Sequence, residues 1–100
     1  MSEAFNIKVG YGEKEVTLTI LPDSKGNYKV IYYGGIMGGV FYKDGDWELI
    51  SVEELEAGDL PVYIPDLKGE RLEIVLDEFI VNAIGDEIEL YYDGNPQLKN

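Results

Sequence analysis

The chain has 100 residues, a formal net charge of −12 and 45% hydrophobic residues, which corresponds to one domain with a packed core. It contains no cysteine and no histidine. Their absence excludes a disulfide framework, Ser-His-Asp and Cys-His catalytic arrangements, and zinc or haem sites built on those ligands.

The first third of the chain predicts three strands. Residues 5–9 and 16–20 alternate apolar and polar side chains, which is typical of half-buried strands. Residues 10–14 lie between them and supply two glycines for a turn, so we expect a hairpin. Residues 28–33 carry Tyr, Val and Ile on both faces and predict a central third strand.

Residues 34–39 read Gly-Gly-Ile-Met-Gly-Gly and leave two interpretations open. The segment is either a mobile loop that presents Ile36 and Met37 to a partner, or a bulge or wide turn in which these side chains cap the core. It lacks the Gly-Lys-Ser/Thr ending of a phosphate-binding loop and the glycine spacing of a dinucleotide site.

Two further strands follow at residues 40–43 and 47–50, and Asp44-Gly45 between them predicts a hairpin turn. Strands that succeed one another at hairpin distance predict an antiparallel meander. Ser51, followed three residues later by Glu54, matches a capping box and predicts a single helical turn. Residues 60–64 are expected to be extended because prolines bias their neighbours that way.

The longest periodic apolar segment covers residues 69–92 and predicts one long amphipathic helix. Its apolar residues recur at three- and four-residue steps along one face: Leu72, Val75, Leu76, Phe79, Ile80, Ala83 and Ile84. Gly85 leaves two alternatives: the helix ends there and residues 88–92 form a sixth strand, or the helix continues to about Tyr92. We favour the continuous helix.

The run Ile84-Gly85-Asp86-Glu87-Ile88-Glu89 resembles an Ile-Gly-x-x-Ile-Glu helix near the C-terminus of some small uncharacterised bacterial proteins. Those proteins also combine a short meander with one final helix. The resemblance covers about the last 16 residues and the order of elements. It implies the same fold and no particular activity.

A second apolar stripe on the predicted helix consists of Ile74, Val81 and Ile88, spaced seven residues apart and nearly opposite the first stripe. A surface helix is expected to be polar there, so this stripe suggests a homodimer seam or a partner-binding face. The alternative is that the residue 61–65 segment or the sheet edge covers it. Together with Ile36 and Met37, these three residues are the candidate interaction surface.

Carboxylates are the most frequent polar groups, but their spacing points to a solvated face. The adjacent Asp77 and Glu78 point in different directions on a helix, and Asp44, Asp46 and Glu48 are only a fragment of a calcium loop. We therefore predict no catalytic residue, no metal ligand and no cofactor. Tyr11, Tyr33, Tyr42 and Trp47 are candidates for a platform that stacks on a sugar or a base, with sheet packing as the simpler interpretation.

We thus predict an α+β fold: an antiparallel meander of five to six strands with one long amphipathic C-terminal helix packed on one face. Residues 1–93 form the domain and residues 94–100 a flexible polar tail. The last fifty residues hold thirteen acids and three bases, which disfavours direct binding to nucleic acid or to an anionic membrane. The acidic start and the lack of a long apolar run predict a cytoplasmic location.

The function predicted from these features is a non-enzymatic protein-interaction domain whose partner is a basic protein or a second copy of the chain. Two alternatives stay open. One is an inhibitor that mimics nucleic acid by placing carboxylates where phosphates would lie, and the other is a small-ligand or sugar binder that uses the surface tyrosines.

Overall fold

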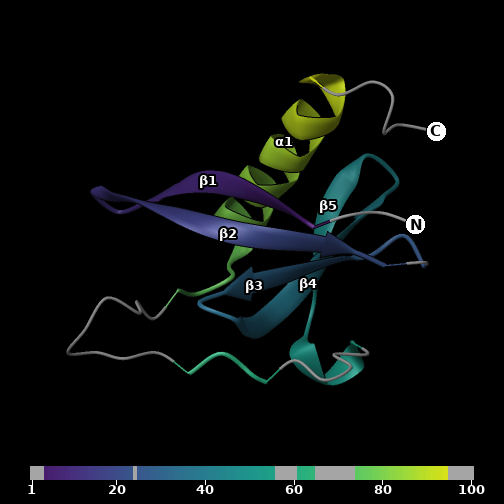
Figure 1. The fold of residues 1–100 in the computed structure, drawn as a ribbon. Helices are drawn as coiled ribbons and strands as arrows, with labels where there is room; N and C mark the ends of the chain where they lie inside the picture. The colour runs from purple at the N-terminus through teal and green to yellow at the C-terminus, as the bar shows by residue number, and fades with distance from the viewer. Residues whose placement is uncertain (1–3, 24, 56–60, 65–73, 95–100) are drawn as a thin grey trace.

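The structure, a computed structural model, describes residues 4–23, 25–55, 61–64 and 74–94. Within these ranges it confirms the α+β fold, with five antiparallel strands in the order β1-β2-β3-β4-β5 and a C-terminal helix (Figure 1). The elements are β1 (Phe5–Tyr11), β2 (Lys14–Pro22), β3 (Tyr28–Tyr32), β4 (Gly35–Lys43), β5 (Asp46–Ile50), the 3-10 turn η1 (Val52–Glu54) and α1 (Glu78–Gly94).

Tight two-residue turns set the register of the meander. The predicted Asp44-Gly45 turn is confirmed: Lys43 pairs with Asp46, and both turn residues have positive φ, 52° and 88°. Such turns match the right-handed twist of the flanking strands. The β3–β4 turn is built in the same way from Tyr33 and Gly34, with φ of 50° and 77°.

The sheet is curled, and α1 packs against its concave face. In Figure 1 the helix crosses behind β1, and it contacts β1 at one edge of the sheet and β5 at the other, together with β4. Alternate strand residues point toward α1, as the two-residue period predicts. The residues of this core are Phe5, Ile7, Val9, Val16, Leu18, Ile20, Val30, Tyr32, Val40, Ile80, Val81, Ile84 and Ile88.

The glycine-rich segment is the first half of β4, so the prediction of a mobile loop is wrong and the bulge interpretation is nearer the structure. The pairing of β3 with β4 shifts register between Val30 and Ile31. The glycines let other segments approach the strand closely. A Cβ at Gly35 would overlap with the backbone of Tyr63, and one at Gly39 would press on Leu55.

Residues 61–64 extend the edge of β4, in agreement with the prediction that they are extended. Ile36 donates its N–H to the carbonyl of Pro61 at 2.8 Å and accepts the N–H of Tyr63 at 2.9 Å. Val62 forms a parallel bridge with Ile36. The backbone of β4 therefore has partners beyond the end of β5, and this explains why Ile36 is fully buried.

The helix begins later than predicted. A continuous helix from residue 69 is wrong, because residues 74–77 are not helical. Residues 65–73 lie outside the described ranges. Asp77 is the N-cap: its Oδ1 accepts the N–H of Ile80 at 2.9 Å, and its carbonyl accepts the N–H of Val81 at 2.9 Å. Leu76 before the cap and Val81 in the first turn occupy the positions of a hydrophobic staple.

The buried face of the helix also differs from the predicted one. Val75 and Phe79, predicted to be in the core, are 56% and 74% exposed. Ile80 and Ile84 are buried as predicted. The other two buried hydrophobic residues of α1 are Val81 and Ile88, which belong to the stripe predicted to face away from the core. The predicted core face is wrong because residues 74–77 are not helical and so do not share a helical phase with the residues after Asp77.

The helix runs without a break through Gly85 to Gly94, which confirms the continuous alternative. The indole ring of Trp47 on β5 lies directly over Gly85, where a Cβ would overlap with the ring. Trp47 also donates its Nε1–H to Oε2 of Glu89 at 2.8 Å. Glycine in a helix costs about 1 kcal/mol relative to alanine, and here it lets β5 and α1 come into contact. The predicted tail covers residues 94–100, but Gly94 is the last residue of α1; residues 95–100 lie outside the described ranges.

Gly85→Ala is predicted to destabilise the fold despite the higher helix propensity of alanine. The added methyl group meets the base of the indole of Trp47, and overpacking of this kind costs roughly 1–3 kcal/mol. Urea unfolding followed by circular dichroism measures the change.

The matched control is Gly94→Ala in the same helix, because nothing lies within 4 Å of a Cβ there. In a Trp47→Ala background, Gly85→Ala is expected to change sign and stabilise by about 1 kcal/mol. Destabilisation of equal size with and without Trp47 would contradict the contact.

Candidate interaction surface

Three of the five predicted surface residues are in the interior. Ile36, Val81 and Ile88 are 0%, 3% and 1% exposed. The prediction that they form an exposed surface is wrong, since α1 turns Val81 and Ile88 toward the sheet and β4 buries Ile36 within the pairing described above. The homodimer seam at seven-residue spacing is therefore part of the hydrophobic core.

The other two, Ile74 and Met37, are half-buried and pack against the same core cluster. The candidate residues thus do not share one accessible face. The accessible apolar side chains are different ones. They include Leu49 in a groove between β5 and α1, and Phe79 and Leu90 on the outer face of the helix.

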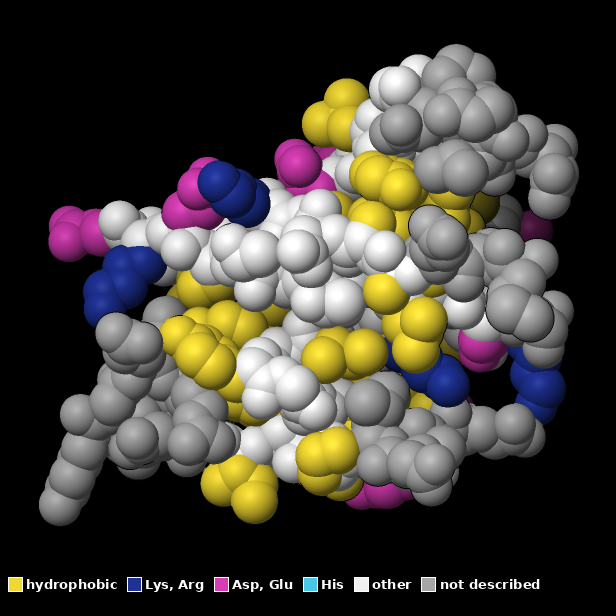
Figure 2. All heavy atoms as spheres, in the orientation of Figure 1, with side chains coloured by type: hydrophobic (Ala, Val, Ile, Leu, Met, Phe, Trp, Pro, Cys, Tyr) yellow, Lys and Arg dark blue, Asp and Glu magenta, His cyan; other side chains and the backbone are white. Residues whose placement is uncertain are grey.

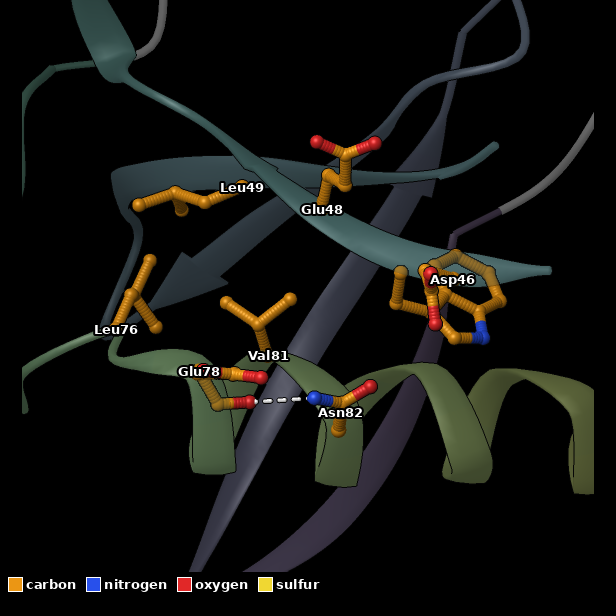
Figure 3. A pocket seen from close by; sticks show the side chains of 8 residues that line it. Asp46, Glu48, Leu49, Leu76, Glu78, Val81 and Asn82 are labelled. Atoms are coloured by element: carbon orange, nitrogen blue, oxygen red, sulfur yellow. Dashed lines mark hydrogen bonds between the residues drawn. The ribbon is translucent and has the colours of Figure 1, made fainter. Parts of the chain in front are cut away.

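The groove is an open depression of about 540 Å³, here called the β5–α1 groove. Its lining residues come from β5, from the segment before α1 and from the first turns of α1: Asp46, Trp47, Glu48, Leu49, Leu76, Glu78, Val81 and Asn82. In Figure 3, Leu49, Leu76 and Val81 point into the space between the strand and the helix. Leu49 is 45% exposed although it is a large apolar residue.

The rim of the β5–α1 groove is acidic. Asp46, Glu48 and Glu78 are exposed carboxylates, and Figure 3 shows the side chain of Glu48 turned away from α1. Asn82 is held in place because its Nδ2 donates to the carbonyl of Glu78 at 2.8 Å. The groove therefore combines an apolar floor with negative charge at its mouth.

The outer face of α1 is the second accessible surface and is formed by Phe79, Asp86, Leu90 and Asp93. These positions are separated by seven, four and three residues, so they lie on one side of the helix. Phe79 and Leu90 are 74% and 61% exposed. The whole helix contains five acids and no base, including no base in its last turn. Apolar and acidic side chains therefore lie side by side on this face.

Figure 2 shows the molecule from the side seen in Figure 1. Hydrophobic side chains form several separate groups over the sheet on this side, and charged side chains gather towards the margins. The half-buried Leu55 packs closely on Gly39, since a Cβ at that glycine would press on the leucine. No single large apolar patch stands out in this view.

The tyrosines proposed as a stacking platform are dispersed. Tyr42 pairs with Trp47, with ring centroids 5.4 Å apart, and Tyr33 pairs with Tyr32 at 4.7 Å. The hydroxyl of Tyr11 accepts the N–H of Val75 at 3.2 Å. A smaller notch of about 320 Å³ lies beside Tyr32 and Tyr33, lined also by Glu15, Val16 and Thr17.

Neither a metal site nor a membrane-spanning helix occurs in the described ranges. No three carboxylates there come close enough together to hold a metal ion. Asp44 and Asp46 instead form the turn and the first residue of β5. Within the same residues, no helix has the length and apolar content needed to cross a membrane.

Comparison with family models, with curated proteins and with solved structures gave no match. The resemblance to small bacterial proteins with an Ile-Gly-x-x-Ile-Glu helix therefore stays a prediction.

A row of aromatic rings crosses the core beneath the C-terminal half of α1. Tyr28 lies 5.7 Å from Trp47 and 6.4 Å from Tyr92, measured between ring centroids, and Phe5 lies 5.7 Å from Tyr92. Burial raises the pKa of the Tyr28 hydroxyl. Burial also raises the pKa of Tyr92, and negative charge on Tyr28 or Tyr91 would raise it further.

These shifts predict a loss of stability at alkaline pH. A pKa raised in the folded state means that the folded protein holds the proton more tightly than the unfolded chain. The resulting stability is complete below the ordinary tyrosine pKa near 10 and is lost as the pH rises through the raised values. In thermal melts across this range, Tyr28→Phe with Tyr92→Phe should retain its Tm to higher pH than the wild type.

The control is Tyr33→Phe, which changes an exposed tyrosine in the β3–β4 turn. An identical alkaline decline for wild type and the Tyr28/Tyr92 double variant would show that neither hydroxyl is responsible.

Proposed function

We propose that the chain is a small acidic, non-enzymatic protein-interaction domain whose partner is a basic protein. The observation that carries this proposal is the outer face of α1. There Phe79 and Leu90 are exposed on a helix whose only ionic side chains are acids. Exposed large apolar side chains rimmed by polar groups are typical of protein-binding surfaces.

The two kinds of side chain would act differently in a complex. Burial of an exposed Phe or Leu stabilises by about 1.5–3 kcal/mol for each side chain, which supports affinity. The acid Asp86 on the same face would attract a basic partner and speed its approach, an effect that salt screens.

The charge of the helix itself favours a cationic partner. All five ionic side chains of α1 are acids, so Lys or Arg side chains of a partner would be attracted to it. A second copy of a chain with net charge −12 would instead be repelled.

The test is capture of proteins from native lysate by the immobilised wild type and by a Phe79→Ser, Leu90→Ser double variant. Both proteins carry the same charge, so a loss of the retained basic proteins in the variant reports apolar burial. We expect at least roughly a tenfold decrease, together with elution of the wild-type partner by salt.

Tyr33→Ser is the matched control, because it removes an exposed aromatic side chain from a different part of the surface. Retention of the same proteins by the wild type and by both variants, or of acidic proteins only, would contradict the proposal.

A further inference from the structure

Among the described residues, β5 pairs with another strand on one side only. β5 is the last strand of the sheet, and the two-residue turn makes Lys43 and Asp46 the closing pair of the hairpin. In an antiparallel pair, hydrogen-bonded and non-hydrogen-bonded positions alternate. Asp46, Glu48 and Ile50 therefore bond to β4, and the peptide groups of Trp47 and Leu49 point away from it.

No backbone hydrogen bond between these two residues and another segment occurs among the described residues. An exposed strand edge of this kind is a template for pairing with another extended chain. A strand added to β5 would lie about 4.8 Å from it, along the wall of the β5–α1 groove.

The side chains around this edge alternate in chemistry. Trp47 and Leu49 are on the side of β5 that faces the helix, and Leu49 points into the groove with Leu76 and Val81 (Figure 3). Asp46 and Glu48 are on the other side of the strand, because successive side chains point to opposite faces. An added strand would thus meet apolar side chains on one face and carboxylates on the other.

We propose that β5 accepts an extended segment of a basic protein as a sixth strand, with apolar side chains in the β5–α1 groove and alternate Lys or Arg side chains beside Asp46 and Glu48. This goes beyond the proposed function, since it adds a second surface for a basic partner, at the edge of the sheet and not on the outer face of α1. Cross-strand pairs of opposite charge stabilise a sheet, whereas like charges placed opposite each other destabilise it.

The same rule argues against a second copy as the occupant. Antiparallel pairing of β5 with β5 about its central residue would place Glu48 opposite Glu48 of the second copy. It would also bring together two chains of net charge −12. The chemistry of this edge therefore selects a cationic strand.

The test uses a capped heptapeptide of alternating Lys and Val as the probe. Trp47 is the single tryptophan of the chain and lines the groove, so its fluorescence reports binding at this site. We expect saturable binding by the unmodified peptide, and at least a tenfold loss for the same peptide with every backbone N–H replaced by N–CH3. The methylated peptide retains all charges and side chains but cannot donate backbone hydrogen bonds to β5.

Leu49→Lys and Tyr33→Lys are the matched protein variants. Both place a lysine at an exposed position with the same change of charge, one inside the groove and the other in the β3–β4 turn. Strand addition predicts at least a tenfold weaker binding for Leu49→Lys and at most a small change for Tyr33→Lys.

Three outcomes would overturn strand addition: equal weakening by the two variants, equal binding of the methylated peptide, or no binding of the unmodified peptide at millimolar concentration. A dimer in light scattering that Leu49→Lys dissociates would also overturn it, because the occupant would be a second copy. Loss of lysate partners on Phe79→Ser, Leu90→Ser substitution is a separate result, so the proposed function can stand when strand addition fails.

Discussion

A curled five-stranded sheet leaves its two edge strands apart, and everything else in this structure depends on α1 filling the space between them. Two contacts fix the helix there. At the β1 edge, Phe5 stacks on Tyr91 with ring centroids 3.8 Å apart and planes within 2°. At the β5 edge, Trp47 covers Gly85 and donates a hydrogen bond to Glu89. These contacts lie at the middle of α1 and in its C-terminal half. The β5–α1 groove lies at the other end, beside the first turns of the helix.

The meander was predictable because its signals are local. Two-residue alternation marks β1 and β2, and Asp44-Gly45 adopts the positive φ that its turn type requires. The role of Gly85 could not be predicted in the same way. A glycine after a run of helical residues is compatible with a helix end, and only the indole of Trp47, 38 positions earlier in the sequence, explains why glycine stands inside the helix.

The candidate surface was mispredicted for a physical reason that concerns helical phase. Apolar residues occur on more than one side of the 69–92 segment, so the assigned core face depends on where the helix begins. Asp77 was the available signal, since Asp before a run of helix formers is a typical N-cap. With that start, Ile80, Ile84 and Ile88 form the central line of the buried face, and Phe79 and Leu90 turn outward. The β5–α1 groove joins residues distant in sequence and therefore has no local signal.

The most direct measurement of this arrangement compares Ile84→Ala with Phe79→Ala in urea unfolding followed by Trp47 fluorescence. Both are large-to-small changes within the first two turns of one helix, but Ile84 is fully buried and Phe79 is exposed. The account predicts a loss of about 2–5 kcal/mol for Ile84→Ala and a change within about 0.5 kcal/mol for Phe79→Ala. A loss for Phe79→Ala equal to or larger than that for Ile84→Ala would contradict it, because the helix would then present its other face to the sheet.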